Sequence, residues 1–300
     1  VEAGRLSFLW SLHCPPAGAL RIRARLFEES SSTHLHFVRL RRDDGAIEER
    51  VLSAGEREWA FEEPAGKGTS VGGYVVLGIE HILGGFDHLA FVSALLLVAS
   101  SLGNVARVVT GFTLAHSLTL ALAATGAVRP QAAPVEALIG LSIALVAVEN
   151  LWLKGTRGTV VPTLVAIGLT GAAAAAAAGV GAVPGTTLLG FALFTACYFA
   201  LLDRSRRPEA LRGAVAFLFG LLHGFGFAAV LAEAGLPPDR LARALLGFNV
   251  GVELGQLAVV AVLWMGLAWL SDERRSVVAD AGSASVLALG TFWFVTRAFG

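Results

Sequence analysis

The chain has 300 residues, of which 55% are hydrophobic, and its mean hydropathy of +0.68 lies far outside the range of soluble proteins. The formal net charge is zero, and no basic surplus marks a nucleic-acid-binding surface, so we expect no nucleic acid partner. The charges are unevenly distributed, because residues 1–70 carry 10 of the 23 Lys and Arg and 11 of the 23 Asp and Glu. A charged module therefore precedes an apolar one.

The charged module, residues 5–62, shows the two-residue alternation that is typical of β-strands. One face of its clearest run carries Leu20, Ile22, Ala24 and Leu26. The sequence Asp43-Asp44-Gly45 has the composition of a hairpin turn between two further strands. We therefore predict a small β domain over residues 1–63, a linker over 64–73 and a transmembrane helical domain over 74–300.

The apolar module contains segments that are each close to the roughly 20 residues that a helix needs to cross a bilayer. A glycine-rich stretch at 179–185 divides some forty apolar residues into two of them. The sequence thus predicts an all-α polytopic membrane bundle of about eight transmembrane helices, preceded by the small β domain. The expected spans are 74–99, 106–126, 134–153, 160–180, 184–202, 212–233, 242–270 and 280–298.

The orientation of the bundle is predicted by the basic residues of its loops, because cytoplasmic loops are enriched in Lys and Arg. If the N-terminal domain lies outside the cytoplasm, the inside loops carry nine basic residues and the outside loops and last helix end carry four. We therefore expect a multi-pass protein of the cell inner (plasma) membrane with an extracytoplasmic N-terminal domain.

Three ionisable residues, His81, Asp87 and His88, lie within the first apolar segment. Such groups at bilayer depth cost roughly 2.5–3.5 kcal/mol each on insertion scales, so they are rare and usually functional. In a straight helix, residues seven apart share one face and lie roughly 10 Å apart along the axis. On that geometry the two histidines cannot bind one ion alone, and other helices must contribute ligands.

Later segments carry further polar residues at expected membrane depth. His116 and His223 lie in the second and sixth segments, and the seventh has a polar stripe at i, i+4 and i+7. A single membrane histidine also often serves only to hydrogen-bond another helix. Glu149 and Trp152, near a segment end, are interpreted as an interfacial charge and an interfacial anchor. The remaining candidates for a pathway or supporting role are Glu80, Ser117, Glu136, Asn249, Glu253 and Gln256.

Several membrane-depth histidines and carboxylates are consistent with handling of a cation, a proton or a hydrolytic water. Imidazole and carboxylate ligands suit nickel, zinc, copper or iron better than calcium or magnesium. The chain has two cysteines and one methionine, so soft Cu(I) is disfavoured.

The strings around these residues resemble the HupE/UreJ family of membrane proteins. They are His81-x5-Asp87-His88-Leu89, Phe112–Ala121, Pro134–Ser142, Phe219–Phe227 and Phe248–Gln256. The resemblance runs from about residue 74 to 260 and is to a branch with an extracytoplasmic N-terminal domain. It implies nickel, sometimes cobalt, supply, with His81, Asp87 and His88 as metal-pathway residues and His116 and His223 as their companions. The chain has Ile82 where the better-known nickel permeases usually have proline.

The main hypothesis is a permease for a divalent transition metal, with nickel or a similar ion as cargo and nickel or zinc as the preferred metal. The alternative is an intramembrane zinc-dependent hydrolase, in which three histidines and a carboxylate hold zinc with one position open for water. In that enzyme Asp87 or Glu253 is the general base and Ser117 a polarising donor. A proton-coupled or sensory membrane protein is the third hypothesis. The expected partners are the lipid bilayer and the metal ion, and a homo-oligomer is left open.

Overall fold

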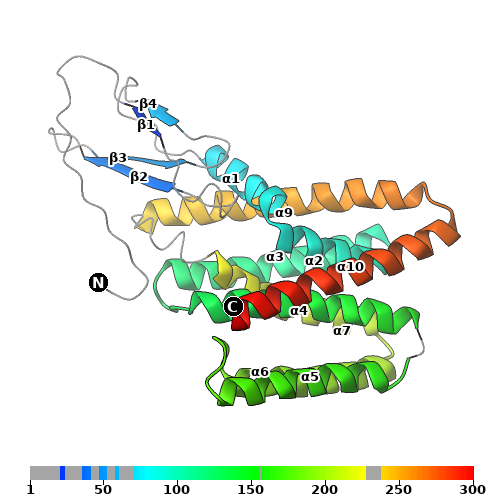
Figure 1. The fold of residues 1–300 in the computed structure, drawn as a ribbon. Coiled ribbons are helices and arrows are strands. Elements are labelled where there is room, and N and C mark those ends of the chain that lie inside the picture. Colours follow the sequence, from blue (N-terminus) through cyan, green and yellow to red (C-terminus); the bar gives the residue numbers. More distant parts are fainter. Residues whose placement is uncertain are drawn as a thin grey trace.

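The computed structural model describes residues 21–23, 36–41, 47–52, 58–60, 71–155, 157–227 and 238–300. Within these ranges the protein consists of four short strands followed by nine helices (Figure 1). The mainly helical class expected for a polytopic membrane protein is therefore confirmed. The helices are α1 (Val71–Gly84), α2 (Phe86–Leu97), α3 (Leu102–Ala124), α4 (Ala132–Lys154), α5 (Val160–Ala177), α6 (Gly185–Arg204), α7 (Pro208–Gly226), α9 (Pro238–Ala268) and α10 (Asp272–Phe299).

The strands form two antiparallel pairs. β1 (Arg21–Arg23) pairs with β4 (Glu58–Ala60), and β2 (His36–Arg41) pairs with β3 (Ile47–Leu52). The β2–β3 pair flanks the predicted hairpin turn, whose own residues, 43–45, lie outside the described part of the chain. Ile22 is opposite Trp59 in the first pair, and Trp59 is buried. The division into a domain at 1–63 and a linker at 64–73 stays a prediction, and α1 begins at Val71.

Of the eight expected spans, six correspond to single candidate membrane helices and a seventh to a bent pair of helices. Among the described residues, six helices are each long and apolar enough to cross a membrane, namely α3, α4, α5, α6, α9 and α10. The pair α1 and α2 passes only when both are taken together as one bent span. The remaining expected segment, 212–233, overlaps α7, a 19-residue helix that packs against α3 and α4 and is not among the candidate spans.

The first span is not a straight helix. α1 and α2 are bent by 72° at Gly85. The backbone nitrogen of Gly85 still donates to the His81 carbonyl oxygen at 2.9 Å, and Leu89 nitrogen donates to the Gly85 carbonyl at 3.0 Å. The bend therefore leaves these backbone groups satisfied, as a lipid environment requires.

This bend overturns the expectation that His81 and His88 lie two straight turns apart. Their ring centroids are 4.7 Å apart, because the change of direction between them folds the second ring back toward the first. Gly85 is buried, and a Cβ at this position would lie 2.8 Å from His81 O and 2.8 Å from His88 Nδ1. Glycine permits this close approach of backbone and ring.

Glycines bring three pairs of helices into close contact. On α9, the face toward α1 carries Gly247, Gly251 and Gly255, spaced four residues apart. A Cβ on Gly247 would lie 2.7 Å from Val71 O. On α7, a Cβ on Gly220 would lie 2.5 Å from the Phe112 carbonyl oxygen of α3. α4 and α10 meet similarly at Gly140 and Gly290. Small residues at such spacing let membrane helices approach closely, which here places α1, α3, α7 and α9 around a common interior.

The α5–α6 hairpin packs mainly on itself at one edge of the bundle, below α4 and α7 in the view of Figure 1. Trp152 of α4, predicted as an interfacial anchor, is instead buried at this edge. Its Nε1 donates to the Gly158 carbonyl at 2.9 Å, and its ring contacts Phe199 of α6. Trp152 therefore joins the hairpin to the bundle.

Candidate metal centre

The structure brings three of the predicted histidines together. One ligand nitrogen each from His81 of α1, His88 of α2 and His116 of α3 lies within 4.8 Å of the others. His223 of α7 adjoins this group, with its ring centroid 5.5 Å from that of His88. Four histidines from four helices thus share one site. The bend at Gly85 brings two of them, His81 and His88, together.

These histidines are buried and poorly satisfied. His88, His116 and His223 are almost inaccessible, and the ring nitrogens of half-buried His81 are themselves covered. Among the described residues, both ring nitrogens of His81 and His116 lack a hydrogen-bond partner, as does Nε2 of His88 and of His223. A buried polar atom without a partner costs about 1–3 kcal/mol. Several such nitrogens aimed at one another indicate a site whose partner is a ligand.

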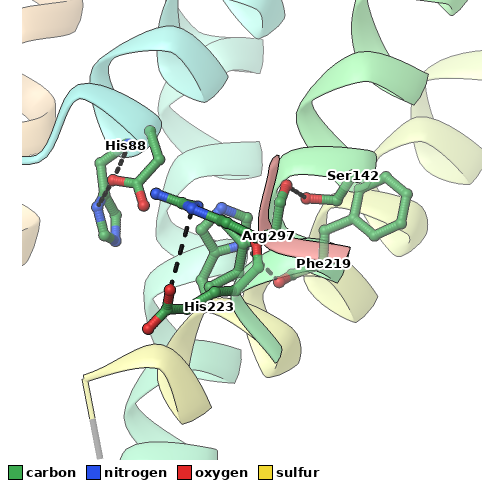
Figure 2. A network of polar contacts seen from close by, with 8 residues as sticks. His88, Ser142, Phe219, His223 and Arg297 are labelled. Atoms are coloured by element: carbon green, nitrogen blue, oxygen red, sulfur yellow. Dashed lines mark hydrogen bonds and ion pairs between the residues drawn. The ribbon is translucent and has the colours of Figure 1, made fainter. Parts of the chain in front are cut away.

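Hydrogen bonds at the other ring nitrogens orient two of these histidines. His88 Nδ1 lies 3.1 Å from Asp87 Oδ1, and the ionised carboxylate can only accept, so His88 carries its proton on Nδ1. In the same way His223 Nδ1 donates to the Phe219 carbonyl oxygen at 2.9 Å (Figure 2). Each bond leaves Nε2 as the nitrogen with a free lone pair. A carboxylate behind a histidine is the usual support of a metal-ligating imidazole.

Phenylalanine rings enclose the histidines. Phe227 and Phe248 stack on each other at 4.8 Å, and both contact the ring of His81. Phe91 and Phe112 lie 5.2 and 5.0 Å from the ring of His223. These rings form an apolar surround for the imidazoles, which was not predicted from the sequence.

A polar stripe continues from the histidines between α3 and α9. Thr113 Oγ1 donates to Gln256 Oε1 at 2.8 Å, and Thr110 Oγ1 donates to Glu253 Oε1 at 2.5 Å. Asn249 neighbours the ring of His116 and donates to the Leu245 carbonyl. Glu253 Oε2, Asn249 Oδ1 and Gln256 Nε2 are buried without a partner among the described residues. The predicted stripe of α9 therefore faces α3 beside the histidines.

The other predicted residues are not members of the histidine group. Glu80 is exposed on α1 and has a partner, whereas half-buried Ser117 donates to the Thr113 carbonyl within α3 at 2.7 Å. Glu136 is exposed at the start of α4, where its carboxylate lies 4.0 Å from Arg297 Nε. Arg297 also donates to the Glu136 carbonyl oxygen at 3.2 Å, within the network drawn in Figure 2.

A second buried polar cluster contains Glu149, Arg212 and Tyr198 from α4, α7 and α6. Glu149 is 3% exposed, so its interpretation as an interfacial charge is wrong. The Arg212 guanidinium pairs with one oxygen of Glu149, and Tyr198 hydroxyl donates to the other at 2.7 Å. The signal in the sequence was a carboxylate among apolar residues near the end of a span, but its partners lie 63 and 49 positions away.

The fold and the site define a multi-pass helical membrane protein with a buried cluster of imidazoles at the junction of four helices. The family model described as HupE / UreJ protein matches residues 57–181 and 159–297, which together cover most of the chain. The chain belongs to the HupE/UreJ family, which confirms the resemblance seen in the sequence. A search of curated proteins found no match, and neither did a search of solved structures.

Proposed function

We propose that this protein is a membrane permease for a divalent transition metal, with nickel or a similar ion as its cargo. The observation that supports this proposal most directly is the convergence of His81, His88 and His116 within 4.8 Å. Membership of the HupE/UreJ family agrees with metal handling.

The chemistry of the donors selects the cargo. Neutral imidazoles suit nickel, zinc, copper and iron, whereas calcium and magnesium prefer oxygen ligands. Nitrogen ligands bind zinc at about 2.0–2.1 Å, so two ligands on one ion lie no more than about 4.2 Å apart. A spread of up to 4.8 Å therefore closes onto an ion with small side-chain movements. Asp87 supports His88 from behind and adds a negative charge close to the bound cation.

The position of the cluster supports transport across the membrane. At 1.5 Å per residue, His116 lies about 12 Å from the end of α3 at Ala124 and about 21 Å from its start at Leu102. Glu136, near the closer surface, is suited to attract a cation at the mouth of a pathway. Thr113 with Gln256 and Thr110 with Glu253 continue the polar route toward the opposite surface. A route of successive weak sites lets an ion leave as well as enter.

We further propose that the protein lies in the inner membrane with residues 1–63 outside the cytoplasm. The excess of basic residues in the loops on the other side supports this orientation. In this orientation, Glu136 lies on the outer side of the membrane and the Thr110–Glu253 pair lies toward the cytoplasm. An ion that enters at Glu136 and follows the polar stripe would then reach the cytoplasm.

The second candidate is an intramembrane zinc-dependent hydrolase. The same three histidines favour it, because three protein ligands with one open position are the usual catalytic zinc site. Its general base would be Glu253, since the Asp87 carboxylate is held by His88. A polar stripe that extends beyond the metal ligands is needed for transport but not for hydrolysis, so we favour the permease.

The test combines metal binding with uptake into proteoliposomes. We expect His88→Ala to abolish nickel or zinc binding and uptake while the melting temperature of the metal-free protein stays near that of the parent. His36→Ala, in strand β2, is the matched control and should bind and transport normally. Unchanged metal handling by His88→Ala, or a loss explained wholly by a collapsed melting temperature, would overturn the assignment. Metal binding without uptake, together with zinc-dependent peptide cleavage, would favour the hydrolase.

A further inference from the structure

A cavity of about 620 Å³ lies between the N-terminal halves of α3 and α7. Arg107 of α3 and Arg206 and Arg207 of the α6–α7 loop line its polar part. Val108, Gly111 and Phe217 line its apolar part. None of these residues belongs to the proposed metal pathway.

The polar part carries an excess of positive charge. Its single acidic residue is Glu209, which accepts a hydrogen bond from Ser100 Oγ at 2.6 Å. Arg107 Nε donates to the Gly103 carbonyl, and among the described residues the structure shows no ion pair for any of the three arginines. A divalent cation would be repelled by this lining, whereas the planar guanidinium groups match the oxygens of a phosphate.

The apolar part runs from the surface into the membrane. Leu102–Ala124 is a candidate span, so Arg107 lies near its end, at the level of lipid headgroups. Phe217 lies about 14 Å further along α7 from Pro208, which is within the hydrocarbon region. Gly111 has no atom within 4 Å of a Cβ built on it, so this wall is open. A soluble anion would fill only the polar part of the cavity and leave its apolar wall uncovered.

We propose that this cavity binds an anionic phospholipid, whose phosphate contacts the arginines and whose acyl chain lies along Val108, Gly111 and Phe217. The lining complements both parts of such a ligand. A cationic cluster lies at headgroup level for the phosphate, and an apolar wall lies below it for the acyl chain. The cavity is at the end of the bundle with the most basic loops, which we place in the cytoplasm, and the cytoplasmic leaflet carries anionic lipids. The lipid joins α3 to α7, the two helices that carry His116 and His223.

The test counts bound lipid by native mass spectrometry. Detergent-purified protein is titrated with phosphatidylglycerol and with phosphatidylcholine of the same acyl chains. We expect phosphatidylglycerol to bind preferentially, and Arg206→Gln/Arg207→Gln to weaken it by roughly tenfold or more, since each basic residue near the surface adds to the attraction. Arg157→Gln/Arg274→Gln removes two exposed arginines from the same end of the bundle and should leave binding unchanged.

A second variant separates a lipid from a soluble anion. Gly111→Leu fills the apolar part and leaves the arginines in place, so it should also reduce phosphatidylglycerol binding. Inorganic phosphate at millimolar concentration should not displace the lipid. Equal binding of the two lipids, or equal loss in both double variants, would overturn the proposal. So would displacement by inorganic phosphate, or unchanged phosphatidylglycerol binding in Gly111→Leu, because either result indicates a phosphate site.

Discussion

The rings of His81 and His88 lie 4.7 Å apart, centroid to centroid, because the helix that carries them bends by 72° between the two residues. A straight helix would separate these rings by about two turns. The bend brings two imidazoles from one stretch of sequence into the same site. The geometry of the proposed site thus depends on a backbone feature at Gly85.

We expect Gly85→Ala to weaken nickel or zinc binding by about tenfold or more, because orientation of the ligands by their surroundings is worth that much in metal sites. The new methyl group would lie 2.8 Å from both His81 O and His88 Nδ1, so the ring or the backbone must move. Isothermal titration calorimetry in detergent measures the affinity. Gly103→Ala, with open space around its Cβ, is the control. Parent-like affinity in Gly85→Ala would show that the bend is not needed.

The hydrogen bond between Asp87 and His88 leads to a separate prediction. We expect Asp87→Asn to reduce metal affinity by about 10–100-fold without abolishing binding, since the carboxylate orients a ligand rather than replacing it. The measurement is the same titration, with the melting temperature of the metal-free protein recorded beside it. Asp280→Asn removes an exposed carboxylate and should have no effect on affinity. Complete loss of binding would instead identify Asp87 as a direct ligand.

We expect the buried Glu149–Arg212 pair to contribute to the stability of the fold. Arg212→Leu leaves the Glu149 carboxylate buried with Tyr198 alone, and loss of one partner of a buried pair costs about 3–5 kcal/mol. Denaturant unfolding in detergent should show this loss, and Glu149→Gln/Arg212→Leu should recover much of it. The exposed Lys154–Asp280 pair is the comparison, and its loss should cost about 1 kcal/mol or less. A double variant as unstable as Arg212→Leu would contradict this account.

A variant of Glu253 separates transport of the metal ion from its binding at the histidines. Its carboxylate accepts from Thr110, and it lies on the polar stripe outside the histidine cluster. We expect Glu253→Gln to slow metal uptake into proteoliposomes several-fold while the equilibrium affinity of the cluster changes little, because a neutral amide attracts a passing cation less strongly. Glu273→Gln, at the exposed start of α10, should transport normally. An equal fall in affinity and uptake would make Glu253 part of the binding site.

The proposed orientation is tested by cysteine labelling in a variant that lacks Cys14 and Cys197. We expect Gln131→Cys, between α3 and α4, to react with an impermeant maleimide in intact cells. Ser205→Cys, between α6 and α7, should react only after permeabilisation, because its loop is rich in arginine. Ser32→Cys should behave like Gln131→Cys. The opposite pattern would invert the bundle and the direction of transport with it.

The helical segments were predictable because a bilayer requires long apolar stretches, which sequence composition reports directly. Even Gly179 and Gly181, in the stretch predicted to divide two spans, adopt positive φ in the turn between α5 and α6. The histidines and the polar face of α9 were predictable for a related reason, since a costly polar residue stands out in an apolar segment.

The geometry of the site was not predictable from helical periodicity. Gly85 permits a bend, but the bend itself depends on how α2 packs against its neighbours, and those contacts are distant in sequence. Phe112 and Phe248 enclose the histidines from different helices, yet in the sequence they are ordinary apolar residues. Glu149 was misjudged because Lys154 is its basic neighbour in sequence, whereas its partner in the structure is Arg212.

The α5–α6 hairpin has an architectural consequence. α4 ends and α7 begins at the same end of the bundle, where the two helices pack against each other, and the hairpin leaves and returns between them (Figure 1). Deleting an even number of spans preserves the direction of every helix that follows. A chain in which a short loop joins Lys154 to Pro208 thus retains all four histidine-bearing helices in their present sense. The hairpin is therefore not needed to set the direction of the histidine-bearing helices, although Tyr198 and Phe199 of α6 tie it to Glu149 and Trp152 of α4.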